Sequence, residues 1–499
     1  MSVGPVVLAG RGSPEWSGPL TGSYPAAALL VVFSLIPYLL LSLAVLPLSR
    51  TIAASLGMSR SVMDITIASS TGAYTAGTVL AVQFAVHLRA RRMLVVYEVL
   101  FVIASVLAAS ATTADVFIGA FIAQGLCTSL MLIAAVPPLV TSWPAEKMPV
   151  TAAIMDLCIF GAVAAGPTLG AFQQAEHAWR PLFWAVAVLS ALALVFSLLT
   201  FEDDPAQDTS APWDFIALTL TIAGSGLAFW GAGQLQSSMR ANAESLVPLI
   251  TGFTLLVVLV IHQYFTRRPL MPVRALASSI PVTGIYIALT ASASSIGIME
   301  LVLQMLEQKT KPIEAGLYFL PEFGAALVIA VVFGSLFRSR YTPLLALAGL
   351  AAIAASAALL LTEVPAVGWT DGVVAGILGL GVGASVSPAL FMAGFSLQSK
   401  SLQRVFAMIE LMRGVTAFLV APVLAFLAAT LGASQVIGLR DAIWICLIIA
   451  LAGLIGGAGL YLSGRPRLIA PDIERWQGED DQPAWPSPPL LAAIRKGRK

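Results

Sequence analysis

The stretch PAAALLVVFSLIPYLLLSLAVLPL, residues 25–48, decides the fold class. No charged residue lies between Glu15 and Arg50, and the apolar run is longer than the core of about 7–15 residues in a cleaved signal peptide. A helix needs about 20 apolar residues to cross a bilayer. We therefore predict that this stretch is a transmembrane helix that the mature protein retains.

The rest of the chain repeats this pattern. Of its 499 residues 58% are hydrophobic and 11% are charged, whereas a soluble domain has about 25% charged residues. Candidate spans lie at residues 25–48, 62–86, 93–112, 114–140, 149–172, 180–200, 213–233, 246–266, 276–303, 315–337, 341–362, 372–396, 403–428 and 440–463. Because lipid cannot satisfy free backbone groups, each span must be helical. The sequence predicts an all-α integral membrane protein with about 14 transmembrane helices.

Positively charged residues predict the orientation of the chain. With the N-terminus inside, most Lys and Arg residues outside the spans fall on the cytoplasmic side, as the positive-inside rule requires. Arginine greatly outnumbers lysine and Asn242 is the single asparagine, a bias typical of a GC-rich bacterial genome. We expect a multi-pass protein of the bacterial inner membrane with both termini in the cytoplasm.

Missing motifs exclude several classes of function. The chain has no Gly-rich loop ending in Gly-Lys-Ser/Thr and no His-Glu-x-x-His. The scattered histidines and cysteines, which suggest neither a metal site nor a disulfide, are His87, His177, His262, Cys127, Cys158 and Cys446. A net charge of +1 gives no general attraction to nucleic acid. We expect no enzymatic activity, no cofactor and no metal, and a function located among the helices.

The segment GAVAAGPTLG, residues 161–170, is the most specific motif of the chain. It lies in the fifth predicted span, and WRPLF follows at residues 179–183. Small residues let helices approach closely and proline lets them bend. The order and spacing resemble the antiporter motif of the fourteen-helix drug:proton antiporter branch of the major facilitator superfamily. The resemblance gives a conformational role to Gly161, Gly166, Pro167 and Gly170.

Other motifs of this branch are present in altered or partial form. The segment AVHLRARR, residues 85–92, resembles the family's loop motif after the second helix, keeping Arg91 and Arg92 and losing its Asp and glycines. The later spans agree better, among them Gly379–Gly383 and Arg413–Gly414. The resemblance covers most of the chain.

The resemblance implies two six-helix bundles that rock around a midplane cavity, with two inserted helices. The implied divisions are a cytoplasmic N-terminus 1–24, an N-terminal bundle 25–200, a link with two helices 201–275, a C-terminal bundle 276–463 and a tail 464–499. The tail is rich in proline and charge, so we expect it to be disordered. The implied function is proton-coupled export of small amphiphilic or hydrophobic molecules. The expected partners are this substrate, protons and the bilayer, and we expect a monomer.

Ionisable residues inside spans are the candidates for proton coupling. At a helix centre each costs about 2.5–3.5 kcal/mol on insertion scales, so it usually faces a cavity or a partner. The candidates are Asp156, Glu322, Glu410, Arg413 and Glu300. Glu410 and Arg413 are three residues apart and can form either a structural ion pair or a proton switch. Glu300 lies near the outer end of its span, where it can reach water.

The position of each remaining acid suggests its role. Asp156, Pro167 and Gly170 fall within about 60° on one face of an ideal helix, which predicts a shared face between the bundles. Glu322 lies two turns into an apolar span, where a structural hydrogen bond or proton exchange near neutral pH is expected. Glu98 lies close to the basic pair in the loop after the second span, so a surface ion pair is expected there.

Two substitutions relative to the family leave other functions open. Tyr38 stands where the first helix of the family carries Asp, and Phe121 stands where the fourth carries Arg. These losses favour, as an alternative, a weakly coupled or uncoupled translocator of lipids or hydrophobic metabolites. The degraded loop motif permits a second alternative, a non-transporting scaffold or sensor. The candidate substrate-binding residues are Tyr38, Phe121, Gln124, Gln304 and Phe391.

Overall fold

The computed structural model describes residues 17–200, 202, 210–364, 367–432, 434–464, 468–478 and 481–490. Fourteen of its helices are long and apolar enough to cross a membrane, which confirms the expected number. Parts of four predicted segments lie outside the described residues: 1–16 of the N-terminal segment, 201 and 203–209 of the link, 365–366 and 433 of the C-terminal bundle, and 465–467, 479–480 and 491–499 of the tail.

Each span is one helix, except the fifth, which is continuous but changes its geometry. The helices are α1 (Tyr24–Leu56), α2 (Arg60–His87), α3 (Ala90–Ser110), α4 (Ala114–Thr141), α5 (Met148–Asp156), α6 (Ala162–Ala175), α7 (Arg180–Leu199), α8 (Phe215–Ser238), α9 (Ala243–Phe265), α10 (Ser279–Lys309), α11 (Pro312–Leu336), α12 (Thr342–Glu363), α13 (Trp369–Phe395), α14 (Leu402–Thr430), α15 (Gln435–Gly464) and α16 (Ile473–Gln477). Short segments η1 (Ala145–Lys147), η2 (Leu157–Gly161) and η3 (Ser399–Ser401) complete the described helices.

Local signals in the sequence begin and end several helices. Oxygens of Ser59 and Asp214 accept hydrogen bonds from backbone N–H groups in the first turns of α2 and α8. Asn242 forms a capping box with Ser245 at the start of α9. Gly57 ends α1 in the left-handed conformation at φ 65°, which glycine adopts without steric cost.

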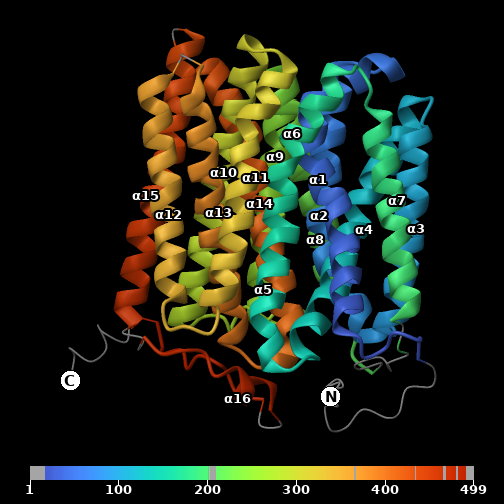
Figure 1. The fold of residues 1–499 in the computed structure, drawn as a ribbon, viewed down its shortest axis with the longest axis vertical. Helices are drawn as coiled ribbons and strands as arrows, with labels where there is room; N and C mark the ends of the chain where they lie inside the picture. Colours follow the sequence, from blue (N-terminus) through green and yellow to red (C-terminus); the bar gives the residue numbers. More distant parts are fainter. Residues whose placement is uncertain are drawn as a thin grey trace.

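The helices form two groups that stand side by side (Figure 1). The first group, α1–α7, is called the N-half, and the second, α10–α15, the C-half. Between them α5 and α6 pack on α11, and α2 packs on α14. Helix α8 touches both α2 and α14 at this seam, and α9 packs on α8. We call the end of the bundle where α1 begins and α15 ends the terminal end.

A π-helical turn interrupts the fifth span. Segment η2 follows Asp156 directly, and the N–H of Ala162 donates to the carbonyl of Leu157. Such a turn accommodates an extra residue and rotates the remainder of the helix by about 100°. Gly166 and Gly170 therefore pack on the backbone of α1, whereas Asp156 faces the C-half. The predicted common face of Asp156 and Gly170 is wrong because it assumed an uninterrupted α-helix.

The described part of the tail is ordered, contrary to the sequence prediction. It contains α16 beneath the terminal end of the bundle (Figure 1), and Ile473, Trp476 and Trp485 are buried. The indole N–H of Trp476 donates to the carbonyl of Leu397 at 2.8 Å. The prediction failed because it rested on average composition, which hides these few apolar anchors among prolines and charges.

Candidate functional site

An open cavity lies in the seam at the end of the bundle opposite the terminal end. Its volume is about 380 Å³, and we call it the vestibule. Its walls come from the ends of α1, α2, α8, α10, α14 and α15, so both halves and the inserted helix α8 contribute. Its charged residues are Arg50, Arg60, Asp64, Glu300, Glu307 and Lys309. A cavity with this lining can hold the polar part of an amphiphilic molecule.

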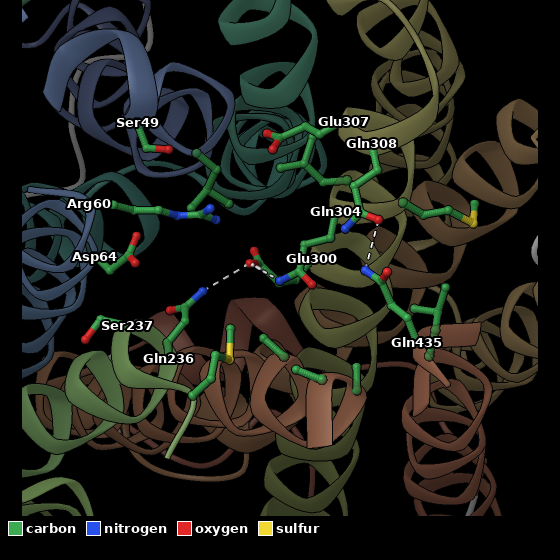
Figure 2. A pocket seen from close by; sticks show the side chains of 18 of the residues that line it. Ser49, Arg60, Asp64, Gln236, Ser237, Glu300, Gln304, Glu307, Gln308 and Gln435 are labelled. Carbon is green, nitrogen blue, oxygen red and sulfur yellow. Dashed lines mark hydrogen bonds between the residues drawn. The ribbon is translucent and has the colours of Figure 1, made fainter. Parts of the chain in front are cut away.

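Glu300 lies at the centre of the vestibule's hydrogen bonds. Its Oε1 accepts from Gln304 at 3.1 Å and from Gln236 of α8 at 3.3 Å (Figure 2). One turn beyond Gln304 on the same face of α10, the amide of Gln435 donates to Gln308 at 2.9 Å. Glu300 thus lines an open cavity, and the inserted helix α8 supplies one of its partners.

A second, much smaller cavity lies deeper in the same seam. This inner cavity has a volume of about 30 Å³, room for one or two waters. Leu39 of α1 and Phe418 of α14 line it, and each lies seven residues before a vestibule residue, Leu46 and Ala425. Seven residues span about 10 Å along a helix. The two cavities therefore follow one another from the open end toward the middle of the bundle.

Glu322 of α11 lines the inner cavity. It is 4% exposed, and its Oε2 has no hydrogen-bond partner among the described residues. Gly379 of α13 packs against its backbone, where an added Cβ would clash with the Glu322 carbonyl oxygen. Burying an unpaired carboxylate is costly, so a neutral acid fits this arrangement best. This carboxyl is buried and lines a cavity with room for one or two waters, the two features expected of a proton carrier.

Asp156 of α5 connects the two halves. Ser387 of α13 donates a hydrogen bond to its Oδ1, and its Oδ2 has no partner among the described residues. A Cβ added to Gly383 would lie 3.0 Å from Oδ2 and in contact with Ile329. Glycine at this position therefore lets α13 pack closely on Ile329 of α11 and leaves space for the Asp156 carboxyl of α5. Any separation of the halves at this level breaks the Asp156 contact.

The Gly383 position gives a direct test of this packing. We expect Gly383→Ala to cost about 1–3 kcal/mol of stability, because the added methyl group overpacks a filled interface. The measurement is thermal unfolding of the purified protein in detergent. Gly324→Ala on α11 is the matched control, since a Cβ there meets no atom within 4 Å. Equal unfolding temperatures for the two variants would contradict the tight packing of Gly383 against Ile329 and Asp156.

Glu410 and Arg413 form the predicted ion pair, and the structure adds a third member. Arg413 Nη2 lies 2.6 Å from Glu410 Oε2, and both side chains are less than a tenth exposed. The hydroxyl of Tyr74, on α2 of the N-half, donates to the same Oε2 at 3.2 Å. The guanidinium also lies 5.8 Å from the ring centre of Phe160. This cluster is a second polar contact between the halves.

At the terminal end the seam is closed. The amide of Gln403 on α14 donates to the carbonyl of Ile133 on α4 at 2.9 Å. A Cβ added to Gly334 of α11 would lie 2.7 Å from the carbonyl of Pro149, which shows how closely α11 approaches the fifth span. The structure is therefore open at one end of the seam and sealed at the other.

The candidate substrate-binding residues do not share one location. Gln304 lines the vestibule. Tyr38 and Phe121 stand in the packed core of the N-half, where Tyr38 bonds Ser70 at 2.8 Å, and Gln124 bonds Ser105 at 3.0 Å. Phe391 packs in a cluster of phenylalanines near the terminal end: Phe333, Phe337, Phe395 and Phe406. In this conformation Gln304 is the member of the set that faces open space among the described cavities.

Sequence patterns alone missed several partners. Ser387 and Tyr74 are ordinary residue types whose role depends on contacts between distant helices. Asp64 and Glu307 carried a usable signal, because each is a carboxyl inside or at the edge of an apolar run. Glu98 was expected at the surface, but it is 1% exposed and accepts a hydrogen bond from Ser34 at 3.1 Å. That prediction is wrong because Glu98 projects from α3 toward α1, and the packing of these two helices buries its carboxyl.

Two bundles of membrane-length helices, with buried carboxyls along their seam and a polar cavity open at one end, define a membrane transporter. The profile of the Major Facilitator Superfamily matches residues 28–421. The chain belongs to the major facilitator superfamily, whose members are transporters and not enzymes.

Individual relatives are distant. The chain is 24% identical over 285 residues to the "Uncharacterized MFS-type transporter YcnB" of Bacillus subtilis, covering 56% of this chain and 58% of that protein. It is 28% identical over 170 residues to the "Lincomycin resistance protein LmrB" of Listeria monocytogenes, covering 34% of this chain and 35% of that protein. The chain thus spans about a third to three fifths of the length of these curated relatives.

Solved structures share the fold. The human organic anion transporter MFSD10 superposes with a TM-score of 0.61 at 13% identity, covering 87% of this chain and 99% of that one. The proton:xylose symporter XylE gives 0.60 at 13% identity, covering 88% and 96%. At this identity the likeness shows the architecture alone.

Proposed function

We propose that this protein exports small amphiphilic or hydrophobic molecules in exchange for protons. The observation that carries the proposal is Glu322, a buried carboxyl without a hydrogen-bond partner among the described residues, in a small cavity between the halves. A path to this acid from one side of the bundle is supported by the vestibule, which follows the inner cavity along the seam. Because Asp156 and Glu410 form polar contacts between the halves, a change of charge near either residue would favour or disfavour separation of the halves. The relative named for lincomycin resistance supports drug export as the direction.

In the proposed orientation the terminal end faces the cytoplasm, and the structure is the outward-facing state of a bacterial inner membrane protein. Glu322 takes a proton from water that enters through the vestibule. The seam can then close on the outer side, because burying the neutral acid costs less free energy than burying a carboxylate. When the terminal end opens, Glu322 meets cytoplasmic water and releases the proton. Substrate leaves through the vestibule in the outward-facing state and enters from the terminal end in the other.

The remaining candidate residues have proposed parts in the same cycle. Asp156 and Glu410 hold the halves together through Ser387 and Tyr74, and Arg413 forms an ion pair with Glu410. Glu300 and Gln304 bind the departing substrate in the vestibule. The conformational set is Gly161, Gly166, Pro167, Gly170, Arg91 and Arg92. Tyr38, Phe121, Gln124 and Phe391 are proposed to line the substrate path in the inward-facing state, and the protein is proposed to act as a monomer.

The proton gradient is a sufficient energy source. One proton that crosses a potential of about 100 mV releases about 2.3 kcal/mol. Because about 1.4 kcal/mol corresponds to a factor of ten, this sustains an approximately fiftyfold gradient of a neutral substrate.

We expect Asp156→Asn to slow export without abolishing it. The amide keeps a hydrogen bond to Ser387 but loses the charge-assisted form, so we expect a rate reduction of about tenfold, equivalent to roughly 1.4 kcal/mol. The measurement is efflux of ethidium, and of lincomycin, from cells that express each variant. Asp115→Asn is the control, because that carboxyl is exposed at the start of α4.

Treatment with a protonophore distinguishes proton-coupled export from the alternative, an uncoupled translocator of lipids or metabolites. Collapse of wild-type efflux by the protonophore supports proton coupling. Efflux that continues unchanged favours the uncoupled translocator. This second candidate is supported by Tyr38 and Phe121, the uncharged aromatic residues in the core of the N-half.

A further inference from the structure

The described tail residues, 468–478 and 481–490, lie across the terminal end and are here called the strap. The strap is fixed firmly to the C-half. The ring of Trp476 packs on Phe395 with centroids 4.4 Å apart, and its N–H bonds the carbonyl of Leu397. The backbone N–H groups of Ala484 and Trp485 both donate to the carbonyl of Phe395, at 2.8 and 3.2 Å.

Further anchors hold the strap to the same half. Asp481 accepts from the N–H and the hydroxyl of Ser399 at 2.6 and 2.7 Å, and it lies 3.7 Å from Lys400. The carbonyl of Pro488 accepts from the N–H of Ser279 at the start of α10, at 3.0 Å. Aromatic packing together with several hydrogen bonds makes the strap a fixed part of the C-half.

One side chain of the strap reaches the N-half. The amide of Gln477, at the end of α16, donates to the carbonyl of Val140 at 3.2 Å and to that of Trp143 at 2.9 Å. Val140 lies in the last turn of α4, where carbonyls have no partner within the helix. Gln477 therefore caps the C-terminus of an N-half helix from the C-half. These two bonds cross the seam at the end that is sealed.

We propose that the strap is an intramolecular latch that holds the terminal end closed through Gln477. The proposal rests on the alternating access proposed above, since only a protein that opens at this end needs such a latch. The strap moves with the C-half, so opening breaks the two bonds of Gln477 and leaves the anchors intact. The latch favours the state in which the vestibule is open, and substrate entry from the terminal end requires its release.

The test measures the distance between the halves at the terminal end. Spin labels are placed at Leu88, after α2, and at Arg340, after α11, in full-length protein whose three cysteines are replaced by serine, and electron–electron double resonance is recorded in lipid nanodiscs. Both positions are exposed. We expect Gln477→Ala to raise the population with a long distance about tenfold relative to the parent, a shift equivalent to about 1.4 kcal/mol. Gln482→Ala is the matched control, because Gln482 bonds Arg475 within the strap.

Two results would overturn the latch. One is the same distance distribution for Gln477→Ala and Gln482→Ala. The other is the same distance distribution for the parent and for Trp476→Ala, a variant that lacks the main anchor of the strap. Because the distances are recorded without substrate or a proton gradient, a negative result here does not depend on whether the protein couples transport to protons. Ethidium efflux in the same variants reports on the transport proposal separately.

Discussion

Replacing Arg413 with alanine is expected to cause the largest loss of stability of any single substitution in the seam. The change leaves the Glu410 carboxylate buried without its cation, and breaking a buried pair from one side costs about 3–5 kcal/mol. The Tyr74 hydroxyl remains as a donor to Glu410 but supplies no charge. The measurement is thermal unfolding in detergent, together with the yield of monodisperse protein.

The double variant Arg413→Gln with Glu410→Gln is the control for this prediction. It removes both charges and keeps similar shapes, so we expect much of the lost stability to return. If Arg413→Ala unfolds at the parent temperature, the pair contributes no net stability, and its interpretation as a charge contact that joins the halves is wrong.

Replacing Glu322 with glutamine is expected to abolish export against a gradient. Glutamine preserves the size and polarity of the side chain in the inner cavity but cannot carry a proton. Downhill movement of substrate is expected to continue, because the vestibule and the seam are unchanged. The measurement is ethidium accumulation in cells with and without a protonophore: the variant should match protonophore-treated wild type.

Glu98→Gln is the control for the Glu322 variant. Glu98 is also a buried carboxyl with an unpartnered oxygen among the described residues, but it lies within the N-half and lines none of the described cavities. We expect this variant to keep proton-driven export. An equal loss of proton-driven export in the two variants would show that removing any buried acid impairs transport, and that the position of Glu322 has no special role.

The fourteen spans were predictable because long apolar runs identify membrane helices in a sequence. The location of Glu322 within a span was predictable for the same reason, since a carboxyl is easily recognised in an apolar run. The ion pair of Glu410 with Arg413 follows from a spacing of three residues on one helix. Each of these features depends on information local to one segment.

The features that could not be predicted depend on contacts between segments or on local irregularity. Ser387 and Tyr74 acquire roles only because α13 and α2 meet acids from the opposite half. The π-turn after Asp156 rotates the remainder of the span, and no residue pattern signalled it. The strap depends on a few buried side chains, chiefly Trp476 and Gln477, within a tail whose composition resembles disorder.

The central claim is that Glu322 carries the proton that drives export. The most direct test is proton movement in proteoliposomes that contain the pH dye pyranine, after ethidium is added to wild type and to Glu322→Gln. We predict that an ethidium gradient moves protons in the opposite direction through wild type and moves none through the variant. Equal proton movement through both proteins, or none through wild type while ethidium is transported, would contradict this claim.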